Sequence, residues 1–340
     1  MLIRRPFDAH LHLRDGAMLR AVLPPTVAHC SGALVMPNLS PPVTTRQAAR
    51  AYRTRILEAR PDGSSFQPQL TAYLTDGIDP DEVVAGFQGG DWIAAKLYPA
   101  HATTNSAHGV TDVRRIDPVL AAMAAAGMPL CVHGEVTRPE VDIFDREAAF
   151  LDEVLAPMLE RHPDLRVVVE HATTKAAVDF VMAAGDRVGM SITAHHLWWN
   201  RNALFAGGLR PHAYCLPVLK RERDREALVG AATSGHARVF FGSDSAPHLV
   251  HRKETDCGCA GVFSAPTAVP AVAALFDEHG ALDTLEAFLS LNGPAWYGLA
   301  PSEEQLELDA ASWTPPAALP SEEGDVRVFL GGEPLAWAAR

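Results

Sequence analysis

The chain has 340 residues, of which 48% are hydrophobic, so it can bury the core of one large α/β domain or of two ordinary ones. A formal net charge of −12 without a block of Lys or Arg argues against a nucleic acid or an anionic membrane as a partner. The sequence has no apolar run of about 20 residues to span a bilayer, no signal-peptide pattern and only five cysteines, which together predict a cytoplasmic chain without a disulfide framework.

The first predicted strand ends in two histidines, His10 and His12, one residue apart. In an extended strand, residues i and i+2 point to the same face, so these imidazoles lie side by side while Ala9, Leu11 and Leu13 face the other way. Two parallel imidazoles are half of a divalent metal site. Taken alone, the motif is equally compatible with two surface histidines on an amphipathic strand.

Seven further β-rich runs follow, and segments of helical character separate them. The β-rich runs cover residues 32–38, 69–74, 92–98, 129–133, 166–171, 189–196 and 238–244. The helical segments cover residues 45–58, 79–87, 112–126, 145–161, 174–184 and 223–234. Strands that are almost continuously apolar and alternate with helices indicate a parallel sheet buried on both faces.

Eight such units in about 250 residues predict an α/β fold, a (β/α)8 TIM-type barrel in a single domain. An open doubly wound sheet is the alternative, but no Gly-rich phosphate turn follows the first strand. We expect the barrel to occupy residues 1–300, and residues 301–340 to pack on it as a C-terminal extension. Within that extension, residues 326–332 are typical of a short terminal hairpin.

Polar residues recur where the predicted strands end, and in a parallel barrel all those ends open on one face. They are His10, His12, Asn38, Lys96, His133, His171 and Asp244. Imidazole and carboxylate ligands without a thiolate favour Zn²⁺, with Mn²⁺ or Co²⁺ as substitutes. Because one zinc takes about four ligands, this many donors predicts a pair of metals about 3.5–4 Å apart.

Such a pair needs an anionic bridge, and the expected position holds Lys96 instead of an acid. A protonated ammonium has no lone pair for a cation. Lys96 could bridge only as a neutral amine that has added CO₂ to form a carbamate. From the residues alone, a lysine that binds substrate as a plain cation is an equal alternative.

Several motifs, taken in order, resemble the shorter, bacterial-type dihydroorotases of the amidohydrolase superfamily over essentially the whole chain. They are His10-Leu11-His12-Leu13-Arg14-Asp15, Met36-Pro37-Asn38, Ala95-Lys96-Leu97-Tyr98-Pro99, Val132-His133-Gly134-Glu135, Glu170-His171 and Asp244-Ser245-Ala246-Pro247-His248. One departure is Ala194-His195-His196, where the family usually has a Pro-Gln pair before the second His. We interpret this change as variation at the rim of the barrel.

The resemblance implies two zinc ions per subunit, bridged by carboxylated Lys96 and a hydroxide. It implies that His10, His12 and Asp244 complete one metal, and that His133 and His171 complete the other. It implies reversible ring closure of N-carbamoyl-L-aspartate to L-dihydroorotate in pyrimidine biosynthesis, by a homodimer. Asp244 borders the nucleophile, so we expect it to act as general base and then as general acid.

The substrate carries a carboxylate, which the planar guanidinium of Arg14 matches. Asn38 and His248 can add hydrogen-bond donors, and the resemblance gives all three this role, with backbone groups of Leu216 and Ala260 holding the ring amide. The polar loop 101–109 is typical of a lid, and we expect Thr103 and Thr104 to close over the substrate.

Two alternatives remain open. One is a hydantoinase or allantoinase, although those enzymes usually carry a β-sandwich built from long terminal extensions, and here His10 lies close to Met1. The other is an inactive relative that serves as an assembly partner, although every ligand position is filled in this chain.

Overall fold

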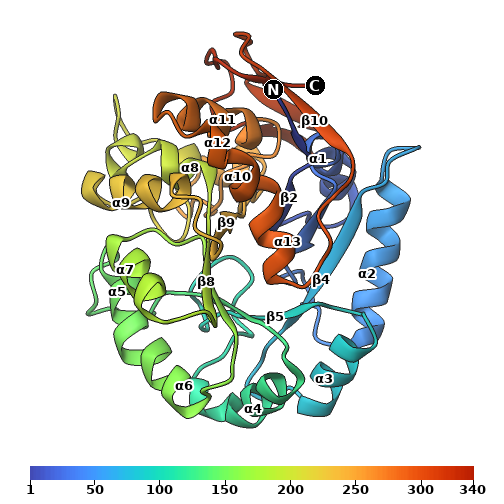
Figure 1. Ribbon diagram of the computed structural model, residues 1–340, viewed down its shortest axis with the longest axis vertical. Helices are drawn as coiled ribbons and strands as arrows, with labels where there is room; N and C mark the ends of the chain where they lie inside the picture. Colours follow the sequence, from blue (N-terminus) through green and yellow to red (C-terminus); the bar gives the residue numbers. More distant parts are fainter.

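A computed structural model describes residues 1–340 and shows eight parallel strands arranged around a barrel (Figure 1). Their order in the sheet is their order in the chain, β2 to β9. Bonds from the two ends close the ring, because the His12 amide donates to Ser245 O at 3.0 Å and the Asp244 amide donates to His10 O at 2.8 Å. The barrel strands are β2 Phe7–Leu11, β3 Gly32–Val35, β4 Gln67–Tyr73, β5 Ala94–Leu97, β6 Leu130–His133, β7 Val167–Glu170, β8 Val188–Ile192 and β9 Val239–Phe241. The predicted barrel is confirmed.

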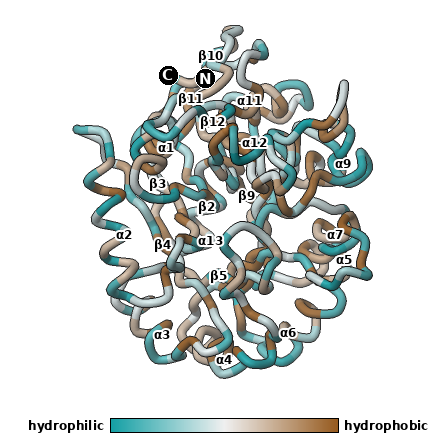
Figure 2. The backbone as a smooth tube through the Cα atoms, turned by 180° about the vertical axis from the view of Figure 1, so that it is seen from behind, coloured by the Kyte–Doolittle hydropathy of each residue, from teal (hydrophilic) through white to brown (hydrophobic).

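Helices surround the barrel, and hydrophobic residues recur along them between hydrophilic ones (Figure 2). Several helices begin at the predicted caps: the Thr45 hydroxyl accepts from the Ala48 amide at 3.2 Å, and the Thr174 hydroxyl accepts from the Ala177 amide at 3.1 Å. The helices are α1 Gly16–His29, α2 Arg46–Ala59, α3 Pro80–Gln88, α4 Asp117–Ala126, α5 Arg146–Phe150, α6 Ala156–Arg161, α7 Lys175–Ala183, α8 Ala194–Trp198, α9 Glu222–Thr233, α10 Val250–Lys253, α11 Ala268–Glu278, α12 Leu282–Glu286 and α13 Asn292–Trp296. None of them is both long and apolar enough to cross a bilayer.

The hydrophobic core has two parts, which lie on either side of the barrel strands. The large part lies between the strands and the helices. The small part fills the barrel interior with residues such as Phe7, Ala9 and Phe240, and Trp296 and Tyr297 from the end of α13 pack against it. The polar site residues follow these apolar residues along the strands, as His10 follows Ala9 and Asp244 follows Phe240, so they lie towards the carboxyl ends.

The opening strand differs from the prediction in one respect. Ala9 packs in the barrel interior, whereas Leu11 and Leu13 belong to the outer core. The pairing of β2 with β3 shifts register between Asp8 and Leu11. Such an irregularity re-aims side chains, as is common beside active sites. The expectation that Ala9 shares a face with Leu11 was therefore wrong, although His10 and His12 do lie on one side.

Other elements also differ from the prediction, and helix α11 was not among the predicted segments. Helix α1 was missed, because Pro24 and Pro25 within it are helix-breaking signals. The predicted strand 189–196 ends at Ile192, since Thr193 caps α8 by accepting from the His196 amide at 3.0 Å. The hairpin lies earlier than expected: β11 (Ala318–Ser321) pairs with β12 (Gly324–Arg327).

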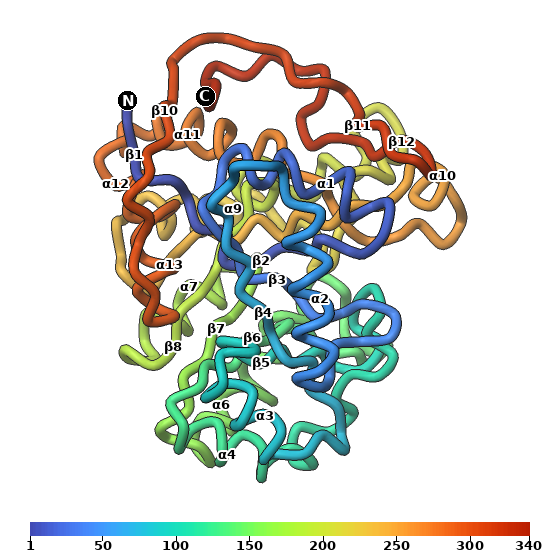
Figure 3. The backbone as a smooth tube through the Cα atoms, turned by 90° about the vertical axis from the view of Figure 1, so that its right-hand side faces the viewer, coloured from blue at the N-terminus to red at the C-terminus, as the bar shows by residue number.

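The C-terminal residues run along the outside of the barrel between its two ends (Figure 3). Strand β10 (Gln305–Asp309) pairs with β1 (Leu2–Arg4) and with β13 (Ala338–Ala339). Between β10 and β13, the hairpin reaches the loop after β9, where Phe329 N donates to Phe263 O at 2.8 Å. A division of the chain at residue 300 remains a prediction.

Candidate active site

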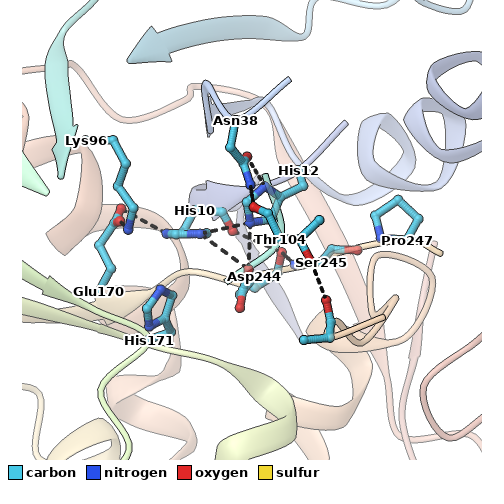
Figure 4. A network of polar contacts seen from close by, with 12 residues as sticks. His10, His12, Asn38, Lys96, Thr104, Glu170, His171, Asp244, Ser245 and Pro247 are labelled. Carbon is cyan, nitrogen blue, oxygen red and sulfur yellow. Dashed lines mark hydrogen bonds and ion pairs between the residues drawn. The ribbon is translucent and has the colours of Figure 1, made fainter. Parts of the chain in front are cut away.

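The predicted ligands from the two ends of the sheet meet at the carboxyl ends of β2 and β9 (Figure 4). The Nε2 atoms of His10 and His12 are 3.4 Å apart. Asp244 Oδ1 lies 3.3 Å from His10 Nε2 and 3.0 Å from His12 Nε2. All three side chains are buried. One metal ion could replace the protons that these atoms now share.

The remaining predicted ligands complete the same cluster. The ring of His171 lies 4.9 Å from that of His10 and 5.0 Å from that of His133, measured between centroids. Lys96 is fully buried and contacts Glu170, which also faces His10 (Figure 4). The structure therefore brings together all six residues that the sequence suggested as ligands.

Three site residues have a backbone conformation that side chains disfavour. Arg14, His171 and Asp244 have φ angles of 58°, 42° and 42°. Non-glycine residues rarely adopt this left-handed region, and they do so mostly where the surroundings enforce it for function. Here the His171 amide donates to Ser191 Oγ at 2.9 Å and so helps to hold the turn.

Three buried carboxylates behind the ligands were missed as functional residues. Glu170 Oε1 lies 2.9 Å from His10 Nδ1, and Glu135 Oε2 lies 2.7 Å from His133 Nε2. Asp8 accepts from the His10 amide at 3.1 Å. A carboxylate on one ring nitrogen fixes the imidazole and leaves the other nitrogen for a metal. Glu170 and Glu135 stand in the quoted motifs and Asp8 stands just before one, each within two residues of a predicted ligand, and this proximity was the available signal.

The electrostatics of the cluster suit a cation. Burial disfavours a charged His10, but Glu170 and Asp244 on either side outweigh it and raise the pKa of His10 to about 9. Burial lowers the pKa of His12 to about 4, which keeps its lone pair available. Burial also opposes the charge on Asp244, yet hydrogen bonds from the two histidines lower its pKa well below the usual value. This donor set, with positive charge favoured at its centre, fits a divalent metal.

The predicted substrate residues surround the cluster. Arg14 Nη2 lies 3.1 Å from His248 Nε2, which is 3.0 Å from Ala260 O. Asn38 Oδ1 lies 2.8 Å from His12 Nδ1. Six of the seven residues line the pocket directly: Arg14, Asn38, Thr103, Thr104, Leu216 and Ala260. His248 contacts two of these residues, Arg14 and Ala260.

The loop after β5 covers the pocket. Asn38 Nδ2 donates to Thr104 O at 3.0 Å, and Thr104 Oγ1 donates to Ala260 O at 3.3 Å. The free space beneath is about 20 Å³, enough for a water molecule. In this conformation the loop therefore restricts access to the pocket.

Comparisons with known proteins identify the family of the chain. Residues 5–307 match the amidohydrolase family. A dihydroorotase of Cupriavidus taiwanensis is 56% identical over all of this chain and 99% of its own length. The crystal structure of a Saccharomyces cerevisiae dihydroorotase in complex with 5-fluoroorotic acid is 32% identical, with a TM-score of 0.92 over 100% of this chain and 98% of that one. A Campylobacter jejuni dihydroorotase structure is 35% identical, with a TM-score of 0.91 over 100% of this chain and 97% of that one.

The chain therefore belongs to the amidohydrolase family, whose barrel and cluster of histidines and acids the structure displays. Relatives that match it over its whole length place it among the dihydroorotases, which makes it a hydrolase that acts on a cyclic amide.

Proposed function

We propose that the chain is a two-zinc dihydroorotase that interconverts N-carbamoyl-L-aspartate and L-dihydroorotate in pyrimidine biosynthesis. The observation that carries the proposal is the convergence of four histidines, one aspartate and a buried lysine beside Arg14. Neither a surface patch nor a structural core needs that set of residues at the mouth of a barrel.

In this proposal His10, His12 and Asp244 would hold one zinc, His133 and His171 would hold the other, and carboxylated Lys96 would serve as a ligand common to both. Bound zinc supplies a water of low pKa and polarises the carbonyl of the substrate. Glu170 and Glu135 orient His10 and His133 from behind. The bare Lys96 ammonium pairs with Glu170, and the carbamate nitrogen of the modified lysine would still carry a hydrogen for the same carboxylate.

Asp244 moves the proton. Its carboxylate faces the ligand cluster and is ionised at neutral pH, so it can accept a proton from the attacking water. It then delivers that proton to the ring nitrogen as the amide bond breaks, and the reverse reaction uses the same atoms. Arg14 supplies a planar pair of donors to the substrate carboxylate, and Asn38 and His248 beside it add further hydrogen-bond donors.

The loop that carries Thr103 and Thr104 excludes water while the substrate reacts. In the closed position Thr104 reaches Ala260, so the two sides of the mouth meet over the pocket. The backbone groups of Leu216 and Ala260 are then placed to hold the ring amide. We also propose that the enzyme acts as a cytoplasmic homodimer, which sedimentation of the purified protein tests for oligomeric state.

The test compares purified enzyme on dihydroorotate, hydantoin and allantoin, with zinc content measured on the same sample. We expect turnover of dihydroorotate to exceed the other two rates by at least about a hundredfold, because only dihydroorotate offers a carboxylate to Arg14. Arg14→Met should abolish that preference. A preference for hydantoin or allantoin would favour the hydantoinase alternative, and protein that binds no zinc would favour an inactive assembly partner.

A further inference from the structure

We propose that His195, His196 and Cys215 form a further zinc site, separate from the predicted catalytic centre. Two of the three residues belong to α8, and Cys215 lies in the segment that leads to the active-site residue Leu216. Neither histidine touches the ligand cluster described above, and the proposed mechanism uses none of the three.

The spacing of the three side chains suits a metal. One ligand atom from each lies within 4.8 Å of the other two. Cys215 Sγ is 3.8 Å from His196 Nε2, close to the roughly 3.5 Å that separates S and N ligands on a tetrahedral zinc. The rings of His195 and His196 lie 4.5 Å apart between centroids. Small side-chain movements would bring all three into coordination range.

His195 is the observation that calls for a ligand. Its side chain is completely buried, and neither of its ring nitrogens has a hydrogen-bond partner. An unpaired buried polar group costs about 1–3 kcal/mol, so native proteins rarely keep one without a bound water or ion. One of its ring nitrogens lies within 4.8 Å of ligand atoms of His196 and Cys215, and a shared cation would satisfy it.

The other two residues already converge on one point. His196 Nε2 lies 3.0 Å from Pro217 O, and Cys215 Sγ donates to the same oxygen at 3.3 Å. On binding zinc, Cys215 releases its thiol proton to solvent, and the His196 proton moves to Nδ1. There it donates to Thr193 Oγ1, now 2.8 Å away. The carbonyl oxygen of Pro217 remains nearby and can serve as the fourth ligand of the zinc.

The residue types in the cluster indicate which metal would bind there. Two imidazoles and one thiolate are typical zinc ligands, and Co²⁺ serves as a spectroscopic substitute. The metal would also fix the Cys215–Pro217 backbone that presents Leu216 to the pocket.

The test is cobalt titration of the metal-free full-length protein, followed by absorption spectroscopy. A near-ultraviolet band from thiolate-to-cobalt charge transfer reports this site specifically, because the proposed catalytic ligands contain no sulfur. We expect the band in the wild type and its loss in Cys215→Ser. We expect His195→Gln to weaken cobalt binding at this band by at least about tenfold, since one of three protein ligands is lost.

The control is a Cys257→Ser/Cys259→Ser double variant, which removes the two thiols of the loop after α10 and should keep the band. If wild-type protein saturated with cobalt shows no such band, or if the band disappears only in this control variant, the proposal is overturned. Should Cys215→Ser fail to fold, His195→Gln decides, because it keeps the thiol and replaces a ring that makes no hydrogen bond. The outcome is independent of the proposed function, since the band requires no turnover.

Discussion

Replacing the buried carboxylate Glu170 by Gln tests whether this one group stabilises the positions of both His10 and Lys96 in the cluster of predicted ligands. Glu170 is completely buried, its Oε1 lies 2.9 Å from His10 Nδ1, and its other oxygen contacts the Lys96 ammonium. Removing one partner of a buried ion pair typically costs about 3–5 kcal/mol, because the other charge is left without compensation. We therefore expect Glu170→Gln to lower the free energy of unfolding of the metal-free protein by about 4 kcal/mol.

Urea denaturation of chelator-treated protein measures this loss, provided that the slope of the transition is unchanged. The matched control is Asp179→Asn, which breaks the exposed pair of Lys175 with Asp179 and should cost at most about 0.5 kcal/mol. Combining Glu170→Gln with Lys96→Met should cost at least about 2 kcal/mol less than the sum of the single changes. A loss below about 1 kcal/mol for Glu170→Gln, or additive effects in the cycle, would refute the reasoning.

Three further predictions follow from neighbouring contacts. Glu135→Gln removes the charged oxygen that orients His133, so zinc affinity should fall by about 10- to 100-fold in competition with a chelator. The exposed variant Glu140→Gln is the control and should leave zinc affinity unchanged. Replacing both Thr103 and Thr104 with Ala should lower kcat by roughly 10- to 100-fold, and unchanged steady-state kinetics would exclude the lid role. Burial lowers the pKa of His195 from 6.5 to about 4 in the metal-free protein. As the pH falls, the imidazole is therefore protonated in the unfolded chain before it is protonated in the folded protein. Between about pH 7.5 and pH 4, the free energy of unfolding of the wild type should therefore fall by about 3 kcal/mol more than that of His195→Gln. Denaturation at each pH measures the difference. Parallel pH profiles of the two proteins would contradict the lowered pKa of His195.

The barrel was predictable because its signals are local and repeated. The β-rich runs are short and apolar, and helical segments separate them. The polar candidate site residues, mostly histidines, stand at the ends of the strands. The direction of a parallel strand then fixes which face these residues share, so His10 and Asp244 could be expected to meet although they are 234 positions apart in the chain. Capping residues such as Thr45 and Thr174 also marked helix starts within one residue.

The parts that sequence reasoning missed depend on tertiary packing. Helix α1 contains two prolines that local rules treat as breakers, yet its buried face holds it against the barrel. The register shift in β2 that turns Ala9 inward has no local signature. Glu135 and Glu170 stood within the recognised motifs, but only the three-dimensional distances show that they face ligand imidazoles.

The meeting of the two chain ends on either side of β10 has a practical consequence. Met1 N donates to Leu308 O at 2.5 Å, while Arg340 N donates to Glu307 O at 2.9 Å, so both ends flank one strand (Figure 1). Neighbouring strands lie about 4.8 Å apart, so a bridge of about 10 Å would join the ends covalently. New termini could then be opened at the exposed Gly207–Gly208 turn, giving a circularly permuted enzyme in which the same eight strands are synthesised in a different order.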